Sequence, residues 1–148
     1  MDSKPAQNIS VLIITLNEET HMSELLNDLV FSDEVIIVDS FSKDKTKEIS
    51  ESFSNVKFIQ HAFENYTTQR NFAIAQAKND WILFLDADER LTPDLKNEIF
   101  NTLRTNDTYT AFLFHRTFMF KDKVLYYSGW QTDKIYRLFN KNFAKYTT

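Results

Sequence analysis

The chain has 148 residues, a formal net charge of −4 and no cysteine, and 43% of its residues are hydrophobic and 15% aromatic. This composition is typical of one globular domain with a largely aromatic core, and it excludes a disordered chain. The charge lacks the basic footprint of nucleic-acid-binding proteins, and the absence of cysteine excludes disulfides and thiolate metal sites. We expect no nucleic-acid partner. The net charge does not exclude a nucleotide ligand, because a cation and a few local hydrogen-bond donors can bind its phosphates.

The sequence predicts neither a signal peptide nor a membrane span. Residues 1–8 are polar and lack the apolar middle of a signal peptide. The longest apolar runs, such as residues 81–85, are far shorter than the roughly 20 residues that a membrane span needs. We therefore expect a soluble, cytoplasmic protein, and a peripheral position of the full-length protein at the inner face of the membrane stays open.

Glycine is rare, because Gly129 is the only one in the chain. Average usage of about 7% would give about ten glycines in a chain of this length. A glycine-rich phosphate loop of either common kind therefore cannot form, and any phosphate must be bound in another way.

Short apolar runs alternate with amphipathic segments over the first two thirds of the chain. The runs are rich in β-branched or aromatic residues and predict strands buried on both faces, as in a parallel sheet. These strands are expected at residues 9–16, 35–38, 56–59 and 81–85. Alternation of strands and helices with short connections implies right-handed crossovers and a doubly wound, mostly parallel α/β sheet flanked by helices.

Helical spacing of apolar residues predicts a helix after each of the four strands. The first two helices are expected to begin with N-caps at Thr20 and Asp44, and the second to end near Phe53. The third covers residues 67–78 and ends at Asn79, which can take the left-handed turn usually given to glycine.

The fourth helix and the C-terminal part have different signals. Thr92 is expected to cap the fourth helix, with Pro93 at its first position. Residues 111–120 and 124–127 flank a polar turn and predict a C-terminal β-hairpin. The remaining tail gives only a weak helical signal, around residues 135–139.

Acidic residues follow two of the predicted buried strands. Asp39 ends the second strand, and Asp86-Ala87-Asp88-Glu89 follows the fourth. In an open α/β sheet the ligand site lies beyond the carboxyl ends of the strands, where the strand order reverses. One Asp after a strand is most often a turn or a helix cap, but converging carboxylates repel one another unless a cation lies among them. Oxygen ligands without His or Cys suit Mg²⁺ or Mn²⁺.

Four segments in this order resemble the family-2 glycosyltransferases, which have the GT-A fold. They are residues 10–19, 38–46, 69–73 and 81–88. The continuation Glu89-Arg90-Leu91, with Gly129-Trp130, Asp133 and Arg137-Leu138-Phe139, is similar to the branch that builds bacterial lipopolysaccharide cores. The resemblance implies inverting, metal-dependent transfer of a sugar from a nucleoside diphosphate, UDP or dTDP above all, to a glycan or lipid-linked acceptor.

The resemblance also implies a role for each matched residue. Asp39 would accept a hydrogen bond from the imide N–H of uracil or thymine, and Arg70 would contact the base or the diphosphate. Asp86 would hold the ribose or the sugar, and Asp88 would ligate Mn²⁺ or Mg²⁺. Two further residues would line the nucleotide pocket, namely Thr15 and Glu18.

The chain departs from the family in its loops and in its last residues. Family glycines are replaced by Phe41, Lys45 and Asn79, so the loop after Asp39 is expected to be stiffer. Family members are longer, and their catalytic base lies beyond the matched segments. We therefore expect residues 1–148 to form a single nucleotide-sugar-binding domain, truncated at its acceptor side, with Asp133 as the one outside candidate for the base. The aromatic hairpin and Trp130 would form either an acceptor wall or plain core.

Three other functions are compatible with parts of the sequence, namely a phosphatase, a sugar nucleotidyltransferase and a non-catalytic binding domain. A phosphatase with an Asp-x-Asp motif would carry it on an early strand, with Thr or Val where Arg90 stands. A sugar nucleotidyltransferase would need a glycine-rich, basic loop where residues 15–18 are acidic. A non-catalytic fragment that binds nucleotide sugar without the base stays open. The histidines show no ligand spacing and are expected to be structural or surface residues; they are His21, His61 and His115.

Overall fold

The computed structural model describes residues 8–120, 123–124 and 134–147. The strands are β1 (Ile9–Thr15), β2 (Glu34–Asp39), β3 (Val56–Gln60), β4 (Trp81–Leu85), β5 (Ala111–His115), β6 (Met119–Phe120), β7 (Lys123–Val124) and β8 (Lys134–Asn140). The helices are α1 (Glu19–Asp28), α2 (Thr46–Glu51), α3 (Tyr66–Gln76) and α4 (Pro93–Thr105).

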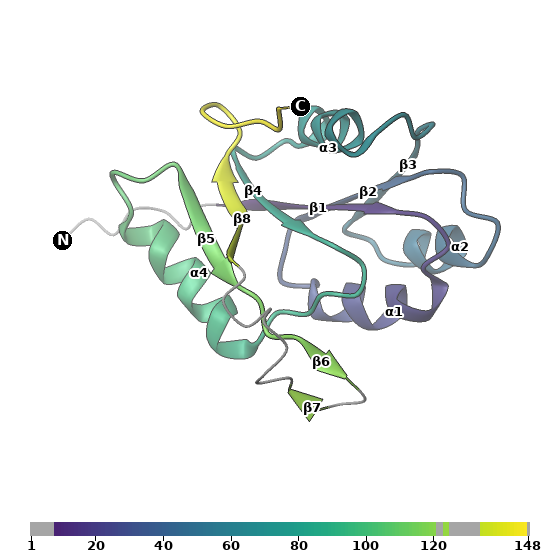
Figure 1. The fold of residues 1–148 in the computed structure, drawn as a ribbon, viewed down its shortest axis with the longest axis horizontal. Coiled ribbons are helices and arrows are strands. Elements are labelled where there is room, and N and C mark those ends of the chain that lie inside the picture. The colour runs from purple at the N-terminus through teal and green to yellow at the C-terminus, as the bar shows by residue number, and fades with distance from the viewer. Residues whose placement is uncertain (1–7, 121–122, 125–133, 148) are drawn as a thin grey trace.

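Six strands form one mixed sheet with helices on both faces (Figure 1). Their order is β3-β2-β1-β4-β8-β5, and β6 and β7 form a separate pair. β1 pairs in parallel with both β2 and β4, and β2 pairs in parallel with β3. β8 runs antiparallel to both of its neighbours, β4 and β5. The predicted doubly wound, mostly parallel sheet is therefore confirmed.

Apolar side chains alternate between the two faces of the sheet and build two core layers. One layer lies between the sheet and helices α1 and α4, and it includes Leu26 and Leu103. The opposite layer lies against α3 and includes Ala73, Ile74 and Phe84 of β4. Strands β1, β2 and β4 are buried on both faces, as predicted, whereas β3 is only half-buried because it lies at the edge of the sheet.

The helix starts follow the prediction at α4 and differ at α1 and α2. Thr92 caps α4 by accepting a hydrogen bond from the Leu95 N–H. α1 begins one residue before Thr20, with Glu18 at the N-cap position, and α2 has Lys45 there in place of Asp44. Both α1 and α2 start in loops that hydrogen-bond to each other, and these contacts between distant residues override the local capping signal.

The third helix is also shifted, and its predicted end is wrong. It begins after Asn65, whose side chain accepts a hydrogen bond from the Thr68 N–H. Asn79 does not take the left-handed conformation, because Asn17 and Phe41 are the non-glycine residues with positive φ in the described segments.

The C-terminal part differs most from the prediction. Residues 135–139 were expected to be helical, but they lie in β8, which fills the gap between β4 and β5. A five-residue apolar run cannot be assigned to helix or strand by periodicity alone, and here the open edge of β4 decides. The hairpin is confirmed in a shorter form, since Met119 pairs with Val124 and Phe120 with Lys123. The segment Ala111–His115 leaves it and joins the main sheet.

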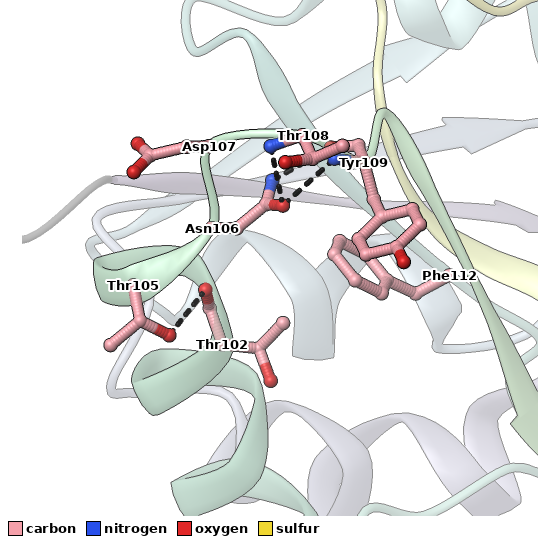
Figure 2. A pocket seen from close by; sticks show the side chains of 7 residues that line it. All are labelled: Thr102, Thr105, Asn106, Asp107, Thr108, Tyr109 and Phe112. Atoms are coloured by element: carbon pink, nitrogen blue, oxygen red, sulfur yellow. Dashed lines mark hydrogen bonds between the residues drawn. The ribbon is translucent and has the colours of Figure 1, made fainter.

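A pocket lies where α4 turns into β5, lined by residues between Thr102 and Phe112, with a volume of about 320 Å³ (Figure 2). Asn106 closes this turn, since its side chain accepts hydrogen bonds from the Thr108 and Tyr109 N–H groups and donates one to the Tyr109 carbonyl at 2.7 Å. The pocket lies at the amino ends of β4 and β5, opposite the edge that carries the predicted site residues. Among the helices that the structure describes, none is long and apolar enough to cross a membrane.

Candidate functional site

The sheet places its topological switch point between β1 and β4. The chain adds β2 and β3 on one side of β1 and then crosses to the other side to form β4. Ligands of open α/β sheets bind outside the carboxyl ends of the strands at such a point. Thr15 and Asp39 end neighbouring strands and are paired in register, and Asp86 directly follows β4. The structure therefore brings these three predicted residues to one edge.

Asp39 is completely buried, and its carboxylate closes the turn after β2. It accepts hydrogen bonds from the backbone N–H of Ser42 at 2.8 Å, from the Ser42 hydroxyl, and from the Gln60 amide at 3.4 Å. The neighbouring Thr15 hydroxyl is buried and has no hydrogen-bond partner among the described residues. A ligand that reaches Asp39 therefore meets a carboxylate that already accepts three hydrogen bonds.

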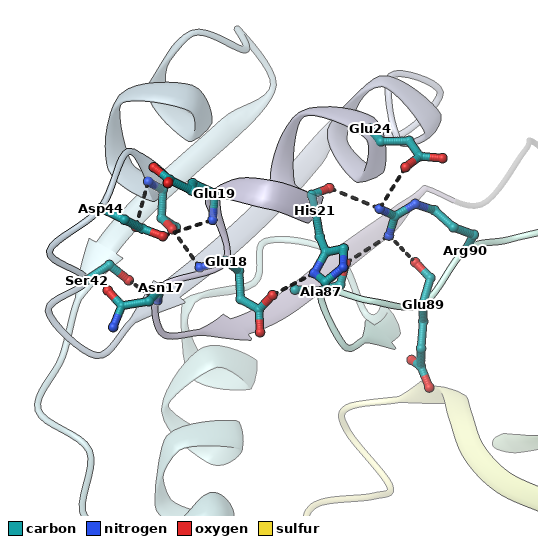
Figure 3. Close-up of polar contacts among 11 residues, drawn as sticks. Asn17, Glu18, Glu19, His21, Glu24, Ser42, Asp44, Ala87, Glu89 and Arg90 are labelled. Atoms are coloured by element: carbon teal, nitrogen blue, oxygen red, sulfur yellow. Dashed lines mark hydrogen bonds and ion pairs between the residues drawn. The ribbon is translucent and has the colours of Figure 1, made fainter. Parts of the chain in front are cut away.

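The loops after β1 and β2 are joined by hydrogen bonds between their backbone and side chains (Figure 3). The Asn17 N–H donates to the Ser42 hydroxyl at 2.7 Å, and the Glu18 N–H donates to the Thr46 hydroxyl at 2.9 Å. The Glu18 carboxylate is not free, because it lies 2.8 Å from the His21 ring nitrogen Nδ1. These contacts hold the start of α1 against the start of α2, which is why the helix starts differ from the local prediction.

Two residues of these loops adopt the left-handed backbone conformation. Asn17 has a φ of 55° and Phe41 a φ of 63°. Asparagine tolerates this region, whereas an aromatic residue there is an outlier and indicates strain. Phe41 is one of the positions where family members often have glycine, and its φ is one that glycine adopts without strain. Phe41 therefore has a steric cost here that glycine would avoid, and the stiffness of the loop stays a prediction.

Arg70 lies in α3 with its guanidinium surrounded by three aromatic rings. The guanidinium carbon is 5.4 Å from the ring centre of Tyr66, 5.9 Å from that of Phe84 and 5.1 Å from that of Tyr146. Within the described segments no carboxylate pairs with Arg70, and its Nε is buried without a hydrogen-bond partner. Arg70 therefore offers an uncompensated positive charge to an anion.

Gln69 and Asn71, on either side of Arg70, fix the position of α3. The buried Gln69 amide donates to the Ser40 hydroxyl at 3.2 Å and to the His61 carbonyl at 3.1 Å. Asn71 binds the backbone of Tyr146 through two hydrogen bonds of 2.9 and 3.0 Å. The resemblance implied a role only for Arg70, although the amide side chains of Gln69 and Asn71 in the same matched motif were a usable signal.

The acidic loop after β4 is organised by Arg137, for which the sequence predicted no role. Arg137 of β8 places Nη2 2.7 Å from Asp86 and 2.6 Å from Glu89. Within the loop, the Glu89 N–H donates to the Asp86 carbonyl at 3.0 Å, and the Glu89 carboxylate accepts from the Asp86 N–H at 2.9 Å. Asp88 is exposed, and its carboxylate has no partner among the residues the structure describes.

Arg137 is only 2% exposed, and its charge is balanced by the two carboxylates. Burial alone would lower the pKa of Arg137, but the charges and hydrogen bonds of Asp86 and Glu89 raise it above its ordinary value. Its Nε and Nη1 atoms are buried and have no hydrogen-bond partner among the residues that the structure describes. A single arginine inside the apolar run of residues 135–139 was the available sequence signal for this contact.

Tyr146 connects Arg70 to this ion cluster. Burial raises the pKa of the Tyr146 hydroxyl, while the nearby charges of Arg70 and Arg137 lower it and those of Asp86 and Glu89 raise it. The net shift is upward, so the hydroxyl stays protonated near neutral pH and can donate a hydrogen bond.

The predicted convergence of three carboxylates does not occur among the described residues, which hold no group of three His, Asp or Glu side chains suited to a metal ion. The reason is that Asp39 is hydrogen-bonded within its own turn and Asp86 is paired with Arg137. Asp88 keeps an available carboxylate, and one oxygen ligand of this kind fits a Mg²⁺ or Mn²⁺ ion whose other ligands are phosphate oxygens and water. The residues thus fit a metal shared with a diphosphate.

The sequence of this chain matches the model of a known protein family. The family model described as glycosyl transferase family 2 matches residues 10–147. The chain belongs to glycosyltransferase family 2. This membership decides against the phosphatase and sugar nucleotidyltransferase alternatives.

Relatives support the membership and show how much of the family this chain spans. An uncharacterized glycosyltransferase of Rickettsia bellii is 36% identical over 143 residues, which cover 95% of this chain and 48% of the relative. The lipopolysaccharide core biosynthesis glycosyltransferase LpsC of Rhizobium meliloti is 32% identical over 107 residues, which cover 70% of this chain and 40% of that protein. The family-2 chain thus spans about half the length of the curated relatives it matches.

Solved structures show that the fold is the GT-A fold of these enzymes. Glucosyl-3-phosphoglycerate synthase of Mycobacterium tuberculosis, solved with Mn²⁺, UDP and glucosyl-3-phosphoglycerate, superposes with a TM-score of 0.59 at 22% identity. The match covers 71% of this chain and 42% of that enzyme. In the present chain, Trp130 and Asp133 lie outside the described residues, so the roles predicted for them stay predictions.

Proposed function

We propose that this chain binds a nucleoside-diphosphate sugar at the carboxyl ends of β1, β2 and β4, with a divalent metal ion. The observation that carries the proposal is a pair of charges at this edge that have no ionic partner among the described residues, the carboxylate of Asp88 and the guanidinium of Arg70. A diphosphate with its metal ion presents the complementary pair, since anionic oxygens suit Arg70 and the cation suits Asp88.

Arg70 is proposed to bind the diphosphate rather than the base. Its three aromatic neighbours hold the guanidinium by cation–π contacts and leave its hydrogen-bond donors unused. Such a preorganised cation stabilises negative charge on the diphosphate as it leaves, without rearrangement during the reaction. The protonated hydroxyl of Tyr146 is a second donor beside it.

Asp88 is proposed as the metal ligand. When bound, Mn²⁺ or Mg²⁺ supplies neutralisation of the charge that develops on the leaving diphosphate. The mycobacterial synthase with the same fold was solved with Mn²⁺ and UDP, which supports this kind of ligand for the fold. Because Asp86 and Glu89 are already paired with Arg137, a single protein carboxylate is expected in the metal site.

The nucleoside is proposed to lie over Thr15, Glu18 and Asp39. The unpartnered Thr15 hydroxyl and the Asp39 carboxylate, which would exchange a present donor for the imide N–H, suit uracil or thymine. Asp86 is proposed to accept a hydrogen bond from the ribose or the sugar through Oδ1, because Oδ2 is bound by Arg137. Its side chain is 38% exposed, which leaves it accessible.

The experiment that tests the base assignment is calorimetric titration with UDP, dTDP, ADP and GDP in the presence of Mn²⁺. We expect the two pyrimidine nucleotides to bind more tightly than the purine nucleotides. Asp39→Ala should weaken UDP binding by about 1.5–3 kcal/mol, the range for a hydrogen bond to a charged group. Asp94→Ala, in the exposed first turn of α4, is the matched control. Equal affinity for all four nucleotides would contradict the assignment of Asp39.

The complete reaction is proposed to be inverting transfer to a glycan or lipid-linked acceptor. LpsC, a lipopolysaccharide core enzyme by name, supports an acceptor of that class. The acceptor hydroxyl must be deprotonated by a base within about 3 Å, and the candidate in this chain is Asp133. A base typically contributes about 10²–10⁴-fold to the rate.

A second candidate function is donor binding without transfer. The chain spans only about half the length of the curated relatives it matches. The two functions are separated by comparing sugar transfer by this chain with transfer by a version extended as in the relatives. We expect donor binding by both and efficient transfer only by the longer one. Equal rates would favour a complete catalytic site here, and Asp133→Asn would then be expected to abolish transfer.

A further inference from the structure

We propose that Arg90 is a positioning residue that fixes the Asp86-Ala87-Asp88 loop for metal and diphosphate binding. This inference rests on the proposed donor site and adds a residue to it.

One guanidinium joins the loop after β4 to the first turn of α1 (Figure 3). Arg90 Nη1 donates to the carbonyl oxygens of Ala87 and Glu89, both at 2.8 Å. Its Nη2 donates to the carbonyl of His21 at 3.1 Å and lies 3.4 Å from the Glu24 carboxylate. The Arg90 side chain is 24% exposed, whereas that of Glu24 is 75% exposed, so the carbonyl contacts dominate.

These contacts fix the backbone from which the Asp88 side chain projects. The Ala87 carbonyl belongs to the peptide group that leads into Asp88, and Arg90 binds this carbonyl directly. The Asp88 side chain is exposed and touches no partner in the described parts of the chain, so the backbone sets its point of attachment and the direction of its Cα–Cβ bond. The hydrogen bond from the Glu89 N–H to the Asp86 carbonyl closes the loop on itself. Arg90 adds two bonds to carbonyls of the same loop and one to His21 of α1.

Arg90 also connects the proposed metal ligand to the proposed nucleoside pocket. α1, which it holds through His21, begins at the loop where the Glu18 N–H binds Thr46. The loops after β1, β2 and β4 therefore form one hydrogen-bonded unit. Lysine cannot replace arginine here, because its single ammonium group does not span carbonyls on two sides as the planar guanidinium does.

The test measures UDP binding, with saturating Mn²⁺ and with EDTA, by the wild-type chain and by Arg90→Lys at low temperature. We expect Arg90→Lys to lose about 10–100-fold of the Mn²⁺-supported affinity, the usual effect of removing a group that orients a metal ligand, and to keep the affinity measured in EDTA. Glu24→Gln, which removes only the exposed carboxylate, and Arg104→Lys, on the exposed face of α4, should keep both affinities. Circular dichroism checks that each variant is folded.

Each other outcome has a distinct meaning. If the wild-type chain binds UDP no better with Mn²⁺ than with EDTA, the proposed metal site is wrong, and the role of Arg90 falls with it. An equal gain from Mn²⁺ in the wild type and in Arg90→Lys would overturn the role of Arg90 alone. The same follows if Arg90→Lys loses affinity equally under both conditions, or if both Arg90→Lys and Arg90→Gln are unfolded, because Arg90 would then serve the fold as a whole.

Discussion

The loops after β2 and β4 both carry an aspartate of the predicted site, but they use it in opposite ways. In the loop after β2, Asp39 is buried and hydrogen-bonded to Ser42, so its carboxylate stabilises its own turn. In the loop after β4, Arg137 and Arg90 hold the surrounding groups and leave Asp88 exposed. The aspartate that ends β2 thus closes a turn, whereas the aspartate in the loop after β4 is left exposed.

The largest expected effect is on the ion cluster of the loop after β4. Arg137→Met should lower the free energy of unfolding by about 3 kcal/mol, because Asp86 and Glu89 would be left without their shared countercharge. Urea denaturation followed by circular dichroism measures this change. Arg104→Met on α4 is the control and should change stability little, since the exposed Arg104 bonds to the exposed Asn101. A change below that of the control would show that the cluster does not stabilise the loop.

The next prediction compares the two aspartates directly. Asp39→Asn should destabilise the fold by about 1–3 kcal/mol, because the buried carboxylate accepts hydrogen bonds that a rotated amide only partly replaces. Asp88→Asn should change stability by less than about 0.5 kcal/mol, as for most exposed positions. Thermal melting of the two variants in EDTA gives the comparison. Equal destabilisation would mean that the two loops do not differ in the way described.

Loss of the helix cap after the acidic loop should have an intermediate effect. Thr92→Ala removes the hydroxyl that accepts a hydrogen bond from the Leu95 N–H. We expect a loss of about 1 kcal/mol in the free energy of unfolding. Thr92→Ser, which keeps the hydroxyl, should retain most of the stability, and an equal loss in both variants would contradict the capping role.

The smallest expected effect concerns backbone strain in the loop after β2. Phe41→Gly should raise the free energy of unfolding by about 0.5 kcal/mol, since relief of roughly 1–2 kcal/mol of left-handed strain is partly offset by the chain entropy of glycine. Asn17→Gly is the matched control, because Asn17 has a similar φ without the steric cost and also donates and accepts hydrogen bonds in the loop. A gain for Asn17→Gly as large as for Phe41→Gly would argue against strain at Phe41.

The sequence was sufficient for the first four strands and for their order along the chain. Residues 81–85 are apolar at every position and rich in aromatic and branched side chains, and the alternation of such runs with helical segments favours strands buried on both faces. The weak run at residues 135–139 was misassigned because its structure depends on the partners that it meets in space, β4 and β5. The predicted first residues of α1 and α2 were wrong for a similar reason, since contacts between the loops before these helices fix where each helix begins.

The sequence named candidate residues for the site, but it did not predict the contacts that these residues make. Asp88 and Arg70 stand in matched motifs, and the structure leaves both with unused charge. The pairing of Asp86 with Arg137 joins residues 51 positions apart, and no local pattern encodes such a contact. The closure of Asp39 by Ser42 is local, but the sequence alone did not separate a turn-forming aspartate from a ligand-binding one.

The most direct test is calorimetric binding of UDP to the wild-type chain and to Asp88→Asn, with and without Mn²⁺. Asp88→Asn should lose the part of the affinity that depends on Mn²⁺ and keep its melting temperature, because Asp88 has no partner among the described residues. Asp94→Asn, another exposed aspartate nearby in sequence, should bind as the wild type does. Full Mn²⁺-dependent binding by Asp88→Asn would contradict the proposal that the loop after β4 holds the metal and the diphosphate.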